Sequence, residues 1–172
     1  MNEIVAFFNQ TFFIVVGGIS TVIAIVSFIY SIYLILNGII PVWLRLGKGL
    51  SKRKIAVYAE NDFINFQSML LDSGIFKEKN IQQITNQSLA KGETHTMMLI
   101  NYMDFKDKIE DILRYKKDSD SLIIYAPSSG ERIEPELMNK INENRNSIVV
   151  NMRGRLLNDI LISMITTIYE KR

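Results

Sequence analysis

The sequence predicts an α/β protein in which an N-terminal transmembrane helix precedes a domain built on a parallel sheet. No charged side chain occurs from Ile4 to Leu44, whereas charges are frequent from Lys52 onward. In that second part, short apolar runs alternate with amphipathic segments, as strands do when helices connect them. We therefore expect a transmembrane helix and juxtamembrane segment in residues 1–50 and a cytosolic α/β domain in residues 51–172.

The overall composition excludes several classes of function. The 172 residues include no cysteine, which excludes disulfides, a thiol nucleophile and cysteine metal sites. The net charge is +2, of which Glu3, Arg45 and Lys48 give +1, so the remainder of the chain carries +1. A nearly neutral domain lacks the basic surface of a nucleic-acid binder, and we expect no nucleic-acid partner.

The uncharged N-terminal run is long enough for one membrane span. About 20 apolar residues cross a bilayer, and Phe12 to Leu36 supplies them. We expect Asn37-Gly38 and Pro41 to end the span, with Trp43 in the headgroup layer. A two-pass hairpin broken at Gly17-Gly18 is the alternative.

Basic residues flank only one side of this run, which predicts its orientation. The N-terminal side has no lysine or arginine, and the C-terminal side has five: Arg45, Lys48, Lys52, Arg53 and Lys54. By the positive-inside rule, the N-terminus lies outside and the C-terminal domain lies in the cytoplasm. We expect a single-pass membrane protein in contact with lipid.

Small residues form a stripe along the predicted span. They recur at intervals of 3 and 4, and Thr21 widens their face: Gly17, Ser20, Ala24, Ser27 and Ser31. Helices in lipid associate through close packing of small residues and through interhelical hydrogen bonds. The stripe predicts a homo-oligomer whose hydroxyls either close a bundle or line a pore. Alternatively, the serines bond to their own backbone.

Five short runs after residue 50 are predicted strands. They are apolar and bounded by polar or turn residues: 54–59, 80–85, 96–102, 121–127 and 147–151. Of these, "SLIIYAP" is the clearest buried strand. The polar segment 86–93 carries no clear pattern.

Four amphipathic segments between and after these strands are predicted helices. The first follows Asp62 as a candidate N-cap and stops at Gly74, and the second spans residues 104–117 with Asp104 as its cap. Pro135 suits the first turn of a third helix through Ile141. The last covers residues 155–170, with Leu157, Ile160, Leu161, Met164 and Ile168 facing inward.

Five strands alternating with helices match a flavodoxin-like, doubly wound (Rossmann-like) domain. In such sheets, ligands bind beyond the carboxyl ends of the strands. The candidate ligand-binding residues there are Glu60, Asn61, Asn101, Ser128, Ser129, Asn151, Arg153 and Arg155.

Two of these candidates, Arg153 and Arg155, flank Gly154 where the fifth strand turns into a helix. A helix start and arginine both favour phosphate, so we predict a small anionic, nucleotide-like ligand. The alternative is that these arginines pair with surface carboxylates or contact a protein.

One stretch resembles part of the TIR domain. In "DSDSLIIYAPSSGERIEPEL", a strand is followed by a serine- and proline-containing loop and a helix bearing acidic residues. The resemblance implies NAD hydrolysis, with Glu134 or Glu136 in the catalytic position. The alternative is that both are ordinary acids in the first turn of a helix.

The whole layout resembles membrane effectors of bacterial antiphage systems, including CRISPR-associated membrane proteins with CARF domains. That resemblance implies a cytosolic domain that senses a nucleotide signal, or binds a defence-system protein, and a membrane part that perturbs the bilayer. It also implies that this membrane is the bacterial inner membrane. His95 is the only histidine, and neither a P-loop nor a GxGxxG motif is present. We therefore expect no metal, no cofactor and no catalytic set, so the leading reading is non-enzymatic. A membrane-tethered NAD hydrolase and a passive membrane scaffold are the alternatives.

Overall fold

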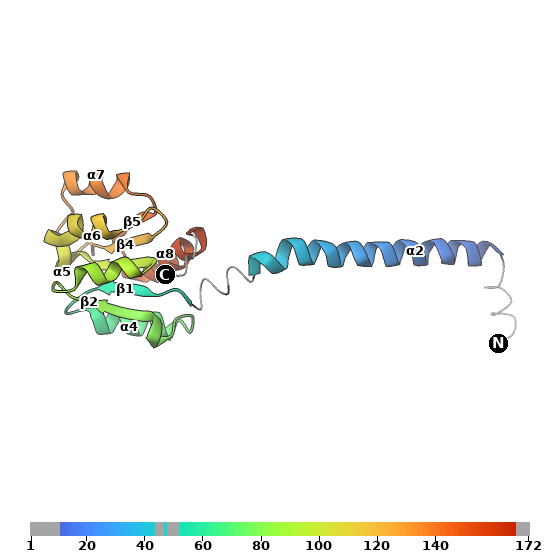
Figure 1. The fold of residues 1–172 in the computed structure, drawn as a ribbon, viewed down its shortest axis with the longest axis horizontal. Coiled ribbons are helices and arrows are strands. Elements are labelled where there is room, and N and C mark those ends of the chain that lie inside the picture. The colour runs from blue at the N-terminus through green and yellow to red at the C-terminus, as the bar shows by residue number, and fades with distance from the viewer. Residues whose placement is uncertain (1–10, 44–46, 48–51, 168–172) are drawn as a thin grey trace. The chain divides into compact units, whose positions relative to one another are not determined.

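The chain divides into two compact units, Met1–Arg45 and Leu46–Arg172. The structure is a computed structural model that describes residues 11–43, 47 and 52–167. Within the described residues, the first unit is one long helix and the second is an α/β fold (Figure 1).

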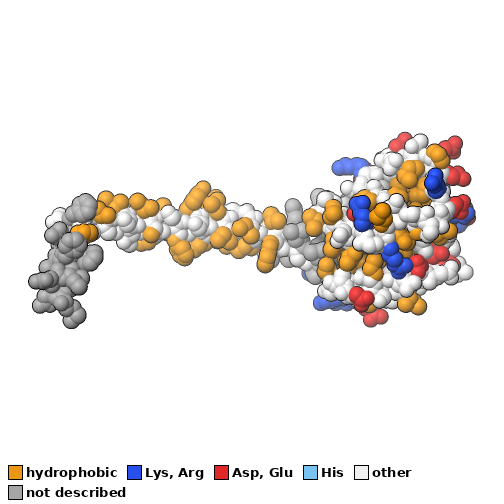
Figure 2. Space-filling view, turned by 180° about the vertical axis from the view of Figure 1, so that it is seen from behind, with side chains coloured by type: hydrophobic (Ala, Val, Ile, Leu, Met, Phe, Trp, Pro, Cys, Tyr) orange, Lys and Arg blue, Asp and Glu red, His pale blue; other side chains and the backbone are white. Residues whose placement is uncertain are grey.

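The first unit has no charged residue over its whole described length. Helix α2 spans Thr11–Leu34, a π-helical turn η1 spans Ile35–Ile39, and helical structure continues to Trp43. Figure 2 shows hydrophobic side chains along this helix. The 31-residue stretch Phe13–Trp43 is long and apolar enough to cross a membrane, and none of its most apolar window is buried within the protein.

A π-helical turn carries the helix past Asn37-Gly38 and Pro41, the residues predicted to end the membrane span. The Ile40 N–H donates to the Ile35 carbonyl, five residues back. The Asn37 side chain donates to the Tyr33 carbonyl at 3.1 Å. In a regular α-helix the ring of Pro41 would crowd the Asn37 carbonyl, and a wider turn relieves such crowding. Leu44–Leu46, with Arg45, and Lys48 lie outside the described residues.

The second unit contains one five-stranded parallel sheet, which confirms the predicted fold class. The strands follow the order β2-β1-β3-β4-β5 and every pairing is parallel. Their bounds are Ile55–Tyr58 (β1), Ile81–Ile84 (β2), Met97–Asn101 (β3), Ser121–Tyr125 (β4) and Ser147–Val150 (β5). All carboxyl ends therefore lie at one edge of the sheet and all amino ends at the other.

Helices cover both faces of the sheet (Figure 1). On one face lie α4 (Phe63–Asp72) and α8 (Arg153–Thr166). On the other lie α5 (Tyr102–Phe105), α6 (Ile109–Tyr115) and α7 (Pro135–Glu143), together with the 3₁₀ helix η3 (Leu89–Thr94). Two further 3₁₀ turns are η2 (Glu78–Asn80) and η4 (Lys106–Lys108).

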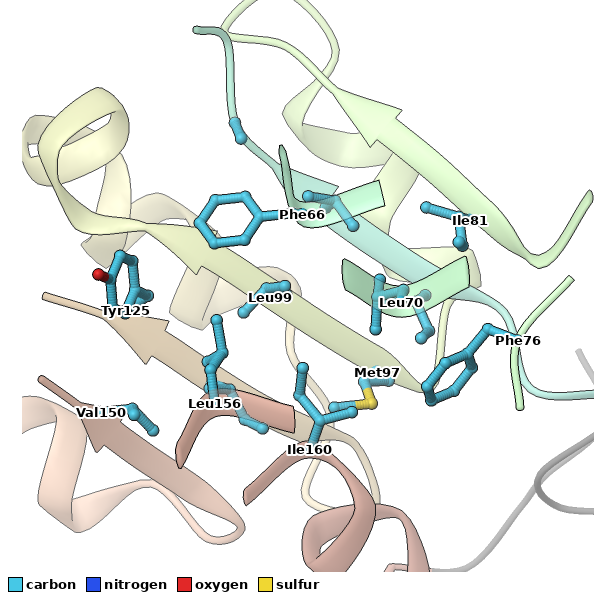
Figure 3. Close-up of a cluster of buried hydrophobic side chains, with 14 of the residues drawn as sticks. Phe66, Leu70, Phe76, Ile81, Met97, Leu99, Tyr125, Val150, Leu156 and Ile160 are labelled. Atoms are coloured by element: carbon cyan, nitrogen blue, oxygen red, sulfur yellow. The ribbon is translucent and has the colours of Figure 1, made fainter. Parts of the chain in front are cut away.

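Burial on both faces explains why the predicted strands read as continuous apolar runs. Every residue of β1, β3 and β4 is buried. Figure 3 shows the cluster on the α4 and α8 face, where Phe66 and Leu70 of α4 and Leu156 and Ile160 of α8 pack over the strands. Strands without a solvent face show no polar alternation.

Several predicted helix details hold, and others change. Gly74 lies just beyond α4 with a positive φ of 70°, as a helix stop requires, and Pro135 is the first residue of α7. Asp62 precedes α4, but its carboxylate accepts from the Asn65 side chain instead of capping a backbone N–H. The predicted helix 104–117 consists of α5, η4 and α6 in succession.

The last helix begins two residues earlier than predicted and ends its described part at Thr166. Ile160 and Met164 face inward as predicted, and Leu157 and Leu161 pack partly against the same core. Leu156, which was not predicted, is fully buried. Ile168 and the rest of the predicted helix lie outside the described residues.

Arg53 belongs to the interior of the α/β unit. Its side chain is 0% exposed. The guanidinium donates to the carbonyls of Met164 and Thr167 and to the Thr167 hydroxyl, at 3.2, 2.9 and 2.7 Å. These bonds satisfy carbonyls at the end of α8. Among the basic residues counted after the apolar run, Arg53 is therefore one whose side chain is buried in the α/β unit.

Tight packing at Gly92 gives a matched pair of stability predictions. A Cβ at Gly92 would lie 1.7 Å from the buried Tyr58 hydroxyl, whereas a Cβ at Gly154 would meet nothing within 4 Å. We expect Gly92→Ala to lower the free energy of unfolding by about 1–3 kcal/mol through overpacking. Gly154→Ala, at a helical position, is expected to leave it unchanged or raise it by roughly 0.5–1 kcal/mol. Urea denaturation followed by circular dichroism tests both, and equal effects would contradict this account.

Candidate functional site

The candidate site is the carboxyl edge of the sheet, where the chain leaves each strand toward a helix. The chain passes from β1 to α4 on one face and from β3 to α5 on the other. β1 and β3 are neighbours in the sheet, so the connections leaving them diverge. This divergence makes the gap between β1 and β3 the switch point at which doubly wound sheets bind ligands.

Hydrogen bonds join the ends of β1 and β3 at the switch point. One carboxylate oxygen of Asp104 accepts from the Glu60 backbone N–H at 2.9 Å and from the Asn101 side chain at 3.1 Å. Two predicted ligand residues, Glu60 and Asn101, are thereby brought together through a residue that was predicted only as a helix cap.

The cap of α5 is Asn101, so the prediction of Asp104 as the cap is wrong. The Asn101 side-chain oxygen accepts from the Met103 N–H at 3.4 Å. Asp104 lies three residues later, inside the helix, which frees its carboxylate to bond across to β1. The spacing Asn101-x-x-Asp104 resembles a capping box, and that sequence signal could have located the true cap.

The Glu60 carboxylate extends this network to the end of β2. It accepts from the Asn86 side chain at 2.7 Å and from the Asn86 backbone N–H at 3.2 Å. Glu60, Asn86, Asn101 and Asp104, which we call the switch-point network, therefore link the ends of three strands. Asn86 fell in a segment that showed no sequence pattern.

The ends of β4 and β5 form a second polar group. The Ser128 hydroxyl donates to the Asn151 carbonyl at 3.3 Å, and Ser129 and Asn61 are exposed at the same edge. These residues offer hydroxyl and amide groups, which can both donate and accept hydrogen bonds. Such groups suit a polar ligand of either sign.

The two predicted phosphate-binding arginines are differently placed. Arg153, the first residue of α8, lies 3.8 Å from the Asp62 carboxylate and 5.8 Å from the centre of the Phe66 ring. Arg155 lies 3.7 Å from Asp159, one turn along the same helix. Both contacts follow the alternative in which the arginines pair with surface carboxylates. The Arg153 pair is long and partly exposed, and such pairs contribute about 0–1 kcal/mol.

A small apolar surface accompanies these polar groups. Ile64, Met103 and Met152 are each at least 45% exposed and lie at the starts of α4, α5 and α8. The Met103 sulfur packs over Gly130, where a Cβ would approach it to 2.8 Å. The edge therefore combines apolar, hydroxyl, amide, carboxylate and guanidinium groups.

The acids implied by the TIR resemblance lie at the start of α7. Glu134 precedes Pro135, Glu136 lies in the first turn, and both are exposed. Within the described residues, no three histidine, aspartate or glutamate side chains are grouped to hold a metal ion. His95 lies at the opposite edge, before β3, where burial lowers its pKa.

The hydroxyls of the transmembrane stripe bond partly within their own helix. Thr21 donates to the Gly17 carbonyl and Ser31 to the Ser27 carbonyl, each at 2.8 Å. A hydroxyl bonded in this way keeps acceptor capacity toward a neighbouring helix. Gly17, Ser20, Ala24, Ser27 and Ser31 are all exposed on α2.

Searches with the chain found no matching family model, curated protein or solved structure.

The switch-point network gives a prediction about local stability. Asp104→Ala removes the acceptor of two hydrogen bonds, and we expect a loss of about 1–3 kcal/mol in the free energy of unfolding. We also expect faster amide hydrogen exchange at Glu60. Asp107→Ala, an exposed control in η4, is expected to change neither quantity. Unchanged exchange at Glu60 in Asp104→Ala would contradict the proposed bond.

Proposed function

We propose that this chain is a single-pass membrane sensor whose α/β unit binds a small anionic ligand and whose apolar helices self-associate. The observation that carries the proposal is the 31-residue apolar helix Phe13–Trp43, none of whose most apolar window is buried. Lipid is the solvent that tolerates such a surface. The basic residues after the helix favour a cytoplasmic α/β unit and an N-terminus outside the inner membrane.

The carboxyl edge supports the ligand-binding half of the proposal. The α8 start presents backbone N–H groups, Arg153 and the Ser128 hydroxyl near one another in the fold, and these groups suit a phosphate. An anionic ligand would compete with Asp62 for Arg153, and the exposed 3.8 Å pair is weak enough to be displaced. A nucleotide meets these requirements, and a protein partner carrying acidic groups is the competing occupant.

Self-association couples this binding to the membrane. A ligand favours one assembly state only if it binds that state more tightly than the other. Under the proposal, ligand binding changes how α/β units pack, and the small-residue stripe then brings the helices into a bundle that perturbs the bilayer. Bacterial antiviral defence is the setting that the resemblance of this layout to antiphage effectors suggests.

Cysteine cross-linking in membranes tests the helix interface, since the native chain contains no cysteine. Ala24→Cys and Ser27→Cys are expected to cross-link efficiently, because both lie on the stripe. Val22→Cys and Ile29→Cys, on the opposite face in a seven-residue repeat, are the matched controls. Changing Ser20, Ser27 and Ser31 together to Leu is expected to abolish cross-linking through Ala24→Cys while the chain stays in the membrane. Equal cross-linking on both faces would rule out this interface.

Ligand binding is tested through Arg153. We expect a panel of nucleotides to raise the melting temperature of the full chain in detergent. Arg153→Gln should weaken binding of any responding nucleotide about 10- to 100-fold, because it removes a charge-assisted hydrogen bond. Arg114→Gln is the control, since Arg114 also pairs with a nearby aspartate but lies on α6. A nucleotide response equal in the two variants would exclude the α8 start as the site.

NAD consumption that Glu136→Gln abolishes would instead favour the hydrolase.

A further inference from the structure

We propose that the α/β unit rests on the anionic headgroup surface of the membrane that its own chain spans. The contact is made by Ile162 and Ile165 of α8 and by Lys52 and Lys54 before β1, which we call the lipid-facing patch. This inference rests on the proposed insertion of the apolar helix and adds a second, peripheral contact with the same membrane.

The apolar half of the patch lies on the last turns of α8. Ile162 and Ile165 are 55% and 57% exposed, whereas Ile160 and Met164 of the same helix are buried. The outward side of α8 carries the polar residues Arg155 and Asn158 near its start and isoleucines near its end. A soluble helix usually keeps polar residues along its whole outer side, so two successive exposed isoleucines indicate a partner.

Arg53 holds the backbone that carries the basic half of the patch near the end of α8. Its buried guanidinium bonds to the carbonyls of Met164 and Thr167, so the backbone at Arg53 lies within one arginine side chain of the end of α8. The neighbours of Arg53 in the sequence, Lys52 and Lys54, are exposed. The bonds of one buried residue thus bring two isoleucines and two lysines to one end of the α/β unit.

The rest of the amino edge of the sheet also carries more basic than acidic side chains. Five segments lead into the strands: residues 52–54, 77–80, 91–96, 116–120 and 144–146. Among their exposed side chains, seven are basic and three are acidic. The described residues 52–167 as a whole carry 16 basic and 16 acidic side chains, so the basic excess is local to the amino edge.

The short connection to the apolar helix favours the lipid surface as the partner of the patch. Ten residues after Trp43 the chain reaches Arg53, a path of at most about 35 Å when fully extended. With the apolar helix inserted, the lipid surface is therefore always within reach of the patch, and this tethering raises its effective concentration. Exposed apolar side chains combined with lysines are the chemistry that binds an anionic bilayer surface. Such docking leaves the carboxyl edge facing the solvent, open to ligand.

Fluorescence quenching in vesicles tests the proposal on the full chain. A single label at Thr166→Cys reports on the patch, and one at Ser129→Cys reports on the carboxyl edge. In vesicles with anionic lipid, headgroup-attached quenchers are expected to quench the Thr166 label strongly and the Ser129 label little. Vesicles of zwitterionic lipid alone should give weaker quenching at Thr166. Lys52→Gln is expected to lower the ratio of docked to undocked protein about fivefold, from roughly 1 kcal/mol per lysine at an anionic surface.

Matched variants separate the patch from general effects. Ile162→Ser with Ile165→Ser is expected to reduce quenching at Thr166 to the level seen at Ser129. Ile64→Ser, an exposed isoleucine at the start of α4, should leave it unchanged. Circular dichroism confirms that each variant is folded.

The outcomes distinguish failure of the patch from failure of the anchor. Retention of the chain after carbonate washing, together with equal quenching at both labels, overturns the docking and leaves the proposed anchoring standing. Loss of the chain on washing overturns both. The docking would also be overturned if quenching at Thr166 changed neither in the double isoleucine variant nor with the charge of the lipid.

Discussion

Burial of the parallel strands on both faces is the constraint on which the rest of the α/β unit depends. Parallel neighbours cannot be joined by tight hairpins, so the chain must cross over each face in a helix or 3₁₀ segment. β1, β3 and β4 are completely buried as a result. The same constraint collects every carboxyl end at one edge of the sheet and every amino end at the other. The candidate ligand site therefore lies at the opposite edge from residues 52–54, which follow the apolar helix in the sequence.

Side-chain hydrogen bonds hold neighbouring elements together at both edges of the sheet. At the carboxyl edge, the carboxylates of Asp104 and Glu60 accept hydrogen bonds from neighbouring backbone and amide groups. These bonds fix the ends of β1, β2 and β3 relative to one another. At the amino edge, the guanidinium of Arg53 donates hydrogen bonds to groups at the end of α8. A rigid sheet held at both ends is a suitable frame for loops that recognise a ligand.

Under the proposed insertion, the apolar unit lies in lipid instead of water. In lipid, each backbone group must be satisfied within the helix or by a nearby side chain. The wide turn before Pro41 and the side-chain bonds of Thr21, Ser31 and Asn37 to earlier carbonyls keep the helix continuous under that rule. A polar side chain can therefore serve its own helix and still be presented to another.

The sequence by itself determined the features that depend on local pattern. Apolar runs such as 121–125, the glycine after α4 and Pro135 at the start of α7 each report the environment of their own segment, so the five strands, the helices and the fold class were predictable. The edge holding the candidate site followed from the fold class. Tertiary structure alone decided the roles of Arg53 and Asp104, because their partners lie far away in sequence, at Met164 and Thr167 for Arg53 and at Glu60 for Asp104. A charged residue beside an apolar helix has the same sequence pattern whether it faces lipid or a buried helix end, and only the folded contacts distinguish the two.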